Sequence, residues 1–211
     1  MTGLAAAGLV GFMLGSIPFS WILARFFGGV DIRTLGSGNV GATNVARSLG
    51  WAAGGAALLL DAAKGSAAVL LAPRLAGPEA PGATLVAGGL AVVGHMASPF
   101  MGFRGGKGVA TGTGVLAVLA PWPLAAAIGV FVAALALSRM VSVGSIAASA
   151  ALPLFALWFG DGGRVALLAA LVGALVILRH RANIIRIVDG SEPRIGRRGG
   201  GGAAGAGGSG R

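Results

Sequence analysis

The chain has 211 residues, of which 55% are hydrophobic and only 10% are charged, with a formal net charge of +10. A water-soluble domain carries about 25% charged residues, so this composition excludes an ordinary soluble protein and indicates an all-α polytopic membrane protein. The absence of cysteine excludes disulfides, thiolate nucleophiles and cysteine-based metal sites.

Seven apolar runs follow one another along the chain and predict about seven transmembrane helices. The first run lacks a basic n-region and a cleavage site, so we interpret it as a retained span, and we expect a kink at Pro18. The fourth and fifth runs are short and could instead form one kinked helix. The runs cover residues 4–26, 51–72, 83–97, 109–120, 124–137, 143–159 and 164–178.

A polar segment between the first two runs contains the sequence GSGNVGATNVAR at residues 36–47. Its glycines allow close backbone approach, its hydroxyl and amide groups form hydrogen bonds, and Arg47 offers a cation suited to phosphate. No acid lies between Asp31 and Asp61, so the segment predicts an anion site. Its G-x-G-x-x-G spacing matches a dinucleotide fingerprint, but that motif needs a βαβ unit, which apolar helical runs do not provide.

The second run contains two charges, Asp61 and Lys64, three residues apart and therefore on one helix face. Charges inside a membrane are costly and usually pair, so we interpret these two as a mutual ion pair facing the helix bundle. His95, in the third run, is interpreted as a helix-end residue whose hydrogen bonds are satisfied.

A second polar loop has the sequence GGKGVAT at residues 105–111. It fails the Walker pattern, because Met101 and Gly108 occupy positions that require glycine and Ser/Thr. We predict a second anion cradle, formed by backbone N–H groups and Lys107 at the start of a helix. The alternative is a basic loop whose glycines serve only flexibility.

The distribution of basic residues predicts the topology. With seven spans, one set of loops holds 13 Lys and Arg residues and the other holds 2, so by the positive-inside rule the N-terminus lies outside and the C-terminus is cytoplasmic. The segments 36–47, 102–111, 138–145 and 180–183 then share the cytoplasmic face and can form one site. The basic set comprises Arg25, Arg33, Arg47, Arg104, Lys107, Arg139, Arg179, Arg181, Arg186, Arg194, Arg197, Arg198 and Arg211.

Taken together, these motifs resemble those of the bacterial integral-membrane glycerol-3-phosphate acyltransferases that use acyl-phosphate as donor. The resemblance covers residues 4–187. It is found in residues 36–44 with Arg47, in DAAKG at 61–65, in GGKGVAT at 105–111, in GSI at 144–146 and in HRANI at 180–184.

This resemblance implies a seven-span domain, residues 1–188, in the bacterial cytoplasmic (inner) membrane with a cytoplasmic-side site. It implies transfer of a fatty acyl group from acyl-phosphate to the 1-hydroxyl of sn-glycerol 3-phosphate, giving lysophosphatidic acid and phosphate, without acyl-CoA or acyl carrier protein as donor. We expect no cofactor, metal, nucleic acid or obligate protein partner. Residues 189–211, rich in Gly, Ala and Arg, are predicted to be a disordered cytoplasmic tail.

Four residues are predicted to be catalytic, and others to bind substrate. Lys107 offsets charge on the leaving phosphate, and the general base is either His180 or a phosphate oxygen of the substrate. The predicted catalytic residues are Lys107, His180, Arg47 and Ser37. The predicted substrate-binding residues are Gly38, Asn39, Gly41, Thr43, Asn44, Gly105, Gly106, Gly108, Thr111, Ser145 and Asn183.

Two other classes of protein compete with this reading. Transporters and channels also have helices broken by Gly and Pro, but their polar groups lie mid-membrane and often in repeated halves. A structural membrane subunit without chemistry has no need for the two glycine-rich polar loops on one side.

Overall fold

The computed structural model describes residues 2–77, 80, 82–160 and 162–196, and every regular element in this part of the chain is a helix. In chain order the elements are α1 (Thr2–Ser16), α2 (Phe19–Gly28), η1 (Ile32–Thr34), α3 (Ala42–Leu49), α4 (Trp51–Ala76), α5 (Ala83–Met96), η2 (Pro99–Met101), α6 (Val109–Leu119), α7 (Pro121–Ser138), α8 (Val141–Trp158), α9 (Gly163–Arg179) and α10 (Arg181–Val188).

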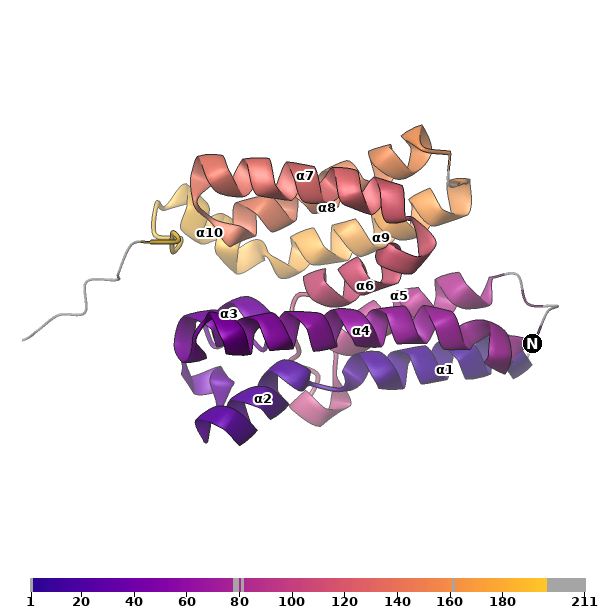
Figure 1. Cartoon of the computed structure of the whole chain (residues 1–211), viewed down its shortest axis with the longest axis horizontal. Helices are drawn as coiled ribbons and strands as arrows, with labels where there is room; N and C mark the ends of the chain where they lie inside the picture. The colour runs from indigo at the N-terminus through magenta and orange to yellow at the C-terminus, as the bar shows by residue number, and fades with distance from the viewer. Residues whose placement is uncertain (1, 78–79, 81, 161, 197–211) are drawn as a thin grey trace, which may run out of the picture.

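The long helices form two layers with the short α6 between them (Figure 1). One layer contains α1 to α5, in which α1 packs on α4 and α5; the other contains α7, α8 and α9, packed in sequence order, and α6 packs against α4. Buried valines from α4, α5, α6 and α9 form a common core. Figure 1 also shows α2, α3 and α10 gathered at one end of the molecule, on the left of the view, so segments of both layers meet there.

Five helical stretches of the described chain are long and apolar enough to cross a membrane, and a sixth is added if α9 and α10, which meet at 57°, count as one. The predicted all-α membrane class is therefore confirmed. The region 109–137 contains two helices, because the backbone leaves helical geometry at Ala120 (φ −150°, ψ 66°). α6 has 11 residues and is about 16 Å long, well short of a ~30 Å hydrocarbon core.

The close packing of α1 on α5 depends on small residues. A Cβ on Gly11 or Gly15 would collide with the backbone of α5 at Ala87 or Ala91, so only glycine permits this separation. The predicted kink at Pro18 is a complete break between α1 and α2. Proline lacks an N–H and disrupts helical hydrogen bonding. At the break, the carbonyl of Ile17 accepts the N–H of Phe19 at 3.1 Å and the ammonium of Lys64 at 2.7 Å.

The C-terminal segment packs on the helices over more residues than the sequence predicted. Residues 189–196 fall in the predicted tail, yet Glu192 is 4% exposed and the N–H of Ile195 donates to the carbonyl of Arg139 at 2.8 Å. We therefore propose that residues 189–196 belong with the helical domain, beyond the boundary expected at 188. The remainder of the predicted tail, 197–211, lies outside the described residues.

Candidate active site

An open cleft of about 440 Å³ is formed by the loop before α3, the loop before α6, and the region where α9 meets α10. Five of its side chains are cations, and none of its lining residues is an acid. The cleft is therefore suited to an anionic ligand. Its lining residues are Ser37, Gly38, Asn39, Val40, Arg104, Gly105, Lys107, Arg179, Arg181, Ala182, Asn183 and Arg186.

The first of these loops is held in shape by Asn44, whose side chain is 1% exposed. Its Oδ1 accepts the N–H of Ser37 at 3.0 Å, and its Nδ2 donates to the carbonyls of Ile32, Leu35 and Asn39 at 2.9 to 3.1 Å. The side chain of Asn44 is therefore engaged within its own loop and orients the segment that presents Ser37. Its predicted role in substrate binding stays a prediction.

The glycine loop before α6 differs from the predicted cradle. The N–H groups of Gly105 and Gly106 donate to the carbonyls of Met96 and His95, each at 3.1 Å, so they are not free to bind an anion. Their own carbonyls accept hydrogen bonds from Arg179, whose Nη2 is 2.8 Å from Gly105 O and 3.2 Å from Gly106 O. The loop thereby holds the guanidinium of Arg179 in the cleft, and the N–H groups of Gly105 and Gly106 are not presented to a ligand.

Lys107 begins a chain of hydrogen bonds that crosses the cleft. Its ammonium donates to Asn183 Oδ1 at 2.5 Å, and Asn183 Nδ2 donates to Glu192 Oε1 at 2.7 Å. Glu192 also accepts from Ser142 at 2.7 Å and from Arg186 at 2.8 Å. Burial raises the pKa of Glu192, but these hydrogen bonds lower it further and hold it below its usual range. The carboxylate therefore stays charged and orients Asn183.

Burial lowers the pKa of Lys107 to about 8. The carboxylate of Glu192 opposes this shift, and the cations Arg186, Arg47 and Arg179 add to it. Lys107 is therefore charged at neutral pH but close to its titration. A bound phosphate would offset the neighbouring positive charges and favour the protonated form.

His180 lies at the bend between α9 and α10, outside both helices. Its side chain is buried, and its Nδ1 is 2.7 Å from the carbonyl of Val176, so Nδ1 carries a proton and donates. Burial lowers the pKa of His180 to about 4, and the imidazole is therefore neutral at pH 7. The residue does not line the cleft.

Several other predicted residues do not line the cleft. Arg47 and Thr43 are exposed on α3, which starts directly after Gly41. Thr111 and Ser145 are buried, in α6 and α8. Arg47 still acts on the site electrostatically, because its charge lowers the pKa of Lys107.

Two glycines of the second loop also lie behind the cleft surface. Gly108 has φ +82° directly before α6, a conformation that favours glycine, and Gly106 is buried against His95.

Of the predicted site residues, the structure brings six together in the cleft: Ser37, Gly38, Asn39, Gly105, Lys107 and Asn183.

Several residues of the site were not predicted. The cleft cations Arg104, Arg179 and Arg186 entered the sequence analysis only as topology signals, Arg181 entered it also as part of the HRANI motif, and Glu192 was assigned to the tail. The available signals were Arg181 within this motif and Arg179 directly before it. In the described part of the chain, His, Asp and Glu nowhere gather in a group of three that could hold a metal.

Comparison with known protein families gives one consistent match. The family model described as glycerol-3-phosphate acyltransferase matches residues 5–190. A glycerol-3-phosphate acyltransferase of Paramagnetospirillum magneticum is 47% identical over 93% of this chain and 96% of its own length. One from Synechococcus sp. is 46% identical over 91% of this chain and 93% of its own length.

Solved structures agree with the sequence comparison. The crystal structure of PlsY (YgiH), an integral membrane glycerol 3-phosphate acyltransferase, in its glycerol 3-phosphate form, is 39% identical with a TM-score of 0.85. The match covers 92% of this chain and 96% of that chain. The lysophosphatidic acid form is 38% identical with a TM-score of 0.83, covering 92% and 95% of the two chains.

Proposed function

The chain belongs to the glycerol-3-phosphate acyltransferase family, and on that premise we propose that it transfers a fatty acyl group from acyl-phosphate to the 1-hydroxyl of sn-glycerol 3-phosphate. The products are lysophosphatidic acid and inorganic phosphate, and the reaction opens the route to phosphatidic acid. The observation that carries this proposal is the cleft, whose lining brings together Ser37 and five cations and includes no acid. Both substrates are phosphate anions, and a related protein has been solved in a glycerol 3-phosphate form and in a lysophosphatidic acid form.

Acyl-phosphate is a mixed anhydride, so the glycerol hydroxyl can attack it directly and no protein nucleophile is required. The glycerol oxygen forms a bond to the acyl carbon, and the bond from that carbon to the phosphate oxygen breaks. The phosphate leaves with the electron pair. Lys107 offsets the charge that develops on the leaving phosphate.

The proton of the glycerol hydroxyl goes to a phosphate oxygen of the substrate. This assignment is supported by the position of His180, whose imidazole does not line the cleft and whose Nδ1 is engaged by Val176. Asn183, fixed between Lys107 and Glu192, is placed to orient glycerol 3-phosphate. Arg47 does not line the cleft but adds to its positive charge, and Ser145 is buried in α8.

The site faces the cytoplasm in this proposal, with seven spans, the N-terminus outside and the C-terminus inside the bacterial inner membrane. The asymmetry of basic residues supports this orientation, as does the gathering of α2, α3 and α10 at one end of the molecule (Figure 1). Glycerol 3-phosphate then enters from the aqueous side, and the acyl chain of the donor extends between the helices into the lipid.

Acyl transfer by purified protein in lipid tests the proposal. Labelled glycerol 3-phosphate is supplied with palmitoyl-phosphate or, in parallel, with palmitoyl-CoA. Label should enter lysophosphatidic acid only with the phosphate donor, and equal rates with both donors would contradict the donor assignment. Counterflow of labelled glycerol 3-phosphate into sealed liposomes checks the transporter alternative and should be absent.

A further inference from the structure

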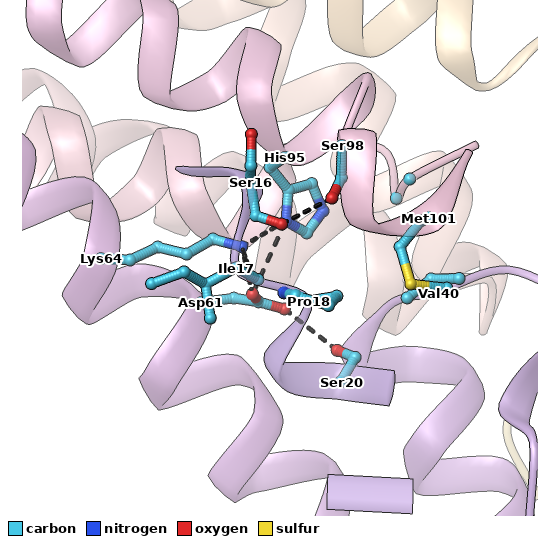
Figure 2. A pocket seen from close by; sticks show the side chains of 12 residues that line it. Ser16, Ile17, Pro18, Ser20, Val40, Asp61, Lys64, His95, Ser98 and Met101 are labelled. Atoms are coloured by element: carbon cyan, nitrogen blue, oxygen red, sulfur yellow. Dashed lines mark hydrogen bonds and ion pairs between the residues drawn. The ribbon is translucent and has the colours of Figure 1, made fainter. Parts of the chain in front are cut away.

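A second cluster of polar side chains is buried inside the first helical layer, behind the cleft. Asp61 and Lys64 come from α4 and His95 from α5, and they are 1%, 4% and 8% exposed. Figure 2 shows these three side chains pointing toward one another, with Ser20 of α2 beside them. The predicted ion pair between Asp61 and Lys64 is confirmed, with 2.8 Å between Oδ1 and Nζ.

This cluster has no room for a substrate. Its cavity is about 10 Å³, the space of about one water molecule. A buried ion pair is also weak support for stability, because a well-packed apolar replacement is often as stable. Charged groups inside a membrane usually mark function. The cavity is lined on one side by Gly105 and Gly106, which suggests that the cluster acts on the glycine loop.

Lys64 fixes the orientation of the His95 ring. Its ammonium donates to Ile17 O at 2.7 Å, lies 3.0 Å from His95 Nδ1 and forms an ion pair with Asp61 Oδ1 at 2.8 Å. Because an ammonium only donates, His95 Nδ1 must accept, and the ring proton sits on Nε2. Ser20 donates to Asp61 Oδ2 at 3.0 Å, whereas Asp61 Oδ1 accepts no hydrogen bond within the described residues and is held by its ion pair with Lys64.

The opposite edge of the His95 ring faces the glycine loop. A Cβ on Gly106 would collide with His95 Nε2, and a Cβ on Gly105 would collide with the His95 carbonyl. That carbonyl also accepts the N–H of Gly106 at 3.1 Å. On its other side the loop is held by Arg179. The two peptide planes directly before Lys107 are thus fixed from both faces.

We propose that the Asp61–Lys64–His95 cluster positions the glycine loop, and through the contact of His95 with Gly106 holds Lys107 in the cleft. These three residues are positioning residues, since none lines the cleft. The inference rests on the proposed function for the role of Lys107. It assigns a purpose to the two intramembrane charges that the reaction itself does not use.

The test compares His95→Ala with His95→Gln and with a matched control, Ser66→Ala. Ser66 is also on α4 and donates to Gly114 O at 2.8 Å, so its loss removes an interhelical hydrogen bond that does not touch the loop. Each protein is assayed for kcat/KM with glycerol 3-phosphate from pH 7.5 to 10, and its thermal unfolding is recorded.

His95→Ala is expected to lower kcat/KM by about 10- to 100-fold, because small misplacements of a binding group are costly. The pH at which kcat/KM falls, expected near 8 in the wild type, should move upward in this variant. A loosened loop exposes Lys107 to water and so weakens the burial that lowers its pKa, while the charged neighbours Glu192, Arg186, Arg47 and Arg179 remain. His95→Gln should restore most of the activity. Kinetics and a pH profile identical to those of Ser66→Ala would overturn the proposal.

Two further measurements keep the outcome decisive. Hydrogen–deuterium exchange of residues 105–107 should be faster in His95→Ala than in wild type, and this readout does not depend on catalysis. Unchanged exchange would contradict the positioning role even if the wild type proved inactive.

Ser20→Ala removes one hydrogen bond from Asp61 and is the variant to use if His95→Ala does not fold. It should shift the pH inflection in the same direction, and an unshifted inflection would contradict the proposal.

Discussion

The ammonium of Lys107 lies 2.5 Å from Asn183 Oδ1, although 76 positions separate the two residues in the chain. Lys107 belongs to the loop before α6 and Asn183 to α10, so this contact joins the two helical layers across the cleft. Because Asn183 is held in turn by Glu192, the amide oxygen is presented to the ammonium in one orientation.

Replacing Asn183 by Ala should lower kcat/KM for glycerol 3-phosphate by about 10- to 100-fold, since hydrogen bonds to charged groups contribute about 1.5–3 kcal/mol each. The measurement is steady-state acyl transfer with acyl-phosphate as donor. Ile184→Ala, a partly exposed position on the same helix, is the matched control and should leave kcat/KM unchanged. Equal effects of the two substitutions would contradict a specific role for Asn183.

Glu192→Ala should destabilise the protein by about 3 kcal/mol, because it leaves Ser142, Asn183 and Arg186 without their common acceptor. The thermal unfolding of purified protein measures this loss. Asp31→Ala removes an ion pair with Arg33 that is partly open to solvent and should change stability little. If the two variants unfold at the same temperature, Glu192 does not have the structural role inferred from its partners.

The pH dependence of kcat/KM should report the titration of Lys107. Its pKa is lowered to about 8, so the charged form is lost as the pH rises through 8, and phosphate binding weakens with it. From pH 7.5 to 9 kcat/KM should therefore fall by about tenfold. The substrate phosphate, with a second pKa of about 6, is already fully ionised in this range.

The control for this profile is Lys107→Arg, whose guanidinium stays charged throughout. Its kcat/KM should show no inflection near pH 8, whatever its absolute value. An inflection that persists in Lys107→Arg would mean that another group titrates.

His180→Ala distinguishes the two candidates for the general base. If a substrate phosphate accepts the proton, the variant should retain kcat within about fivefold while KM rises. Removal of a true general base costs about 10²- to 10⁴-fold in kcat. Measuring kcat at saturating glycerol 3-phosphate separates these outcomes, and a loss of the larger size would make His180 the base.

Much of the helical framework could be predicted from the sequence, because apolar runs of span length have few alternatives in a bilayer. Pro18 and the Pro121 region mark helix breaks because proline cannot continue the hydrogen-bond ladder. The helix α3 was missed, because its eight residues, ATNVARSL, mix four apolar and four polar side chains over only about two turns, and the polar ones were considered only as ligand groups.

The contacts of the site were harder to predict, because they depend on residues far apart in the chain. Glycine-rich composition indicated an anion cradle at Gly105 and Gly106, but only the tertiary structure places the carbonyls of His95 and Met96 against their N–H groups. Asn44 shows the same limit: an amide suited to a ligand is equally suited to bonding its own loop.

The most direct test of the account is the transfer of label from glycerol 3-phosphate to lysophosphatidic acid by purified wild-type protein, Lys107→Ala and Arg74→Ala, with acyl-phosphate as donor. Arg74 is an exposed cation in the last turn of α4, outside the cleft. We predict that wild type and Arg74→Ala transfer label at equal rates and that Lys107→Ala, still folded, loses nearly all transfer. Full activity in Lys107→Ala would contradict the assignment of this cleft as the active site.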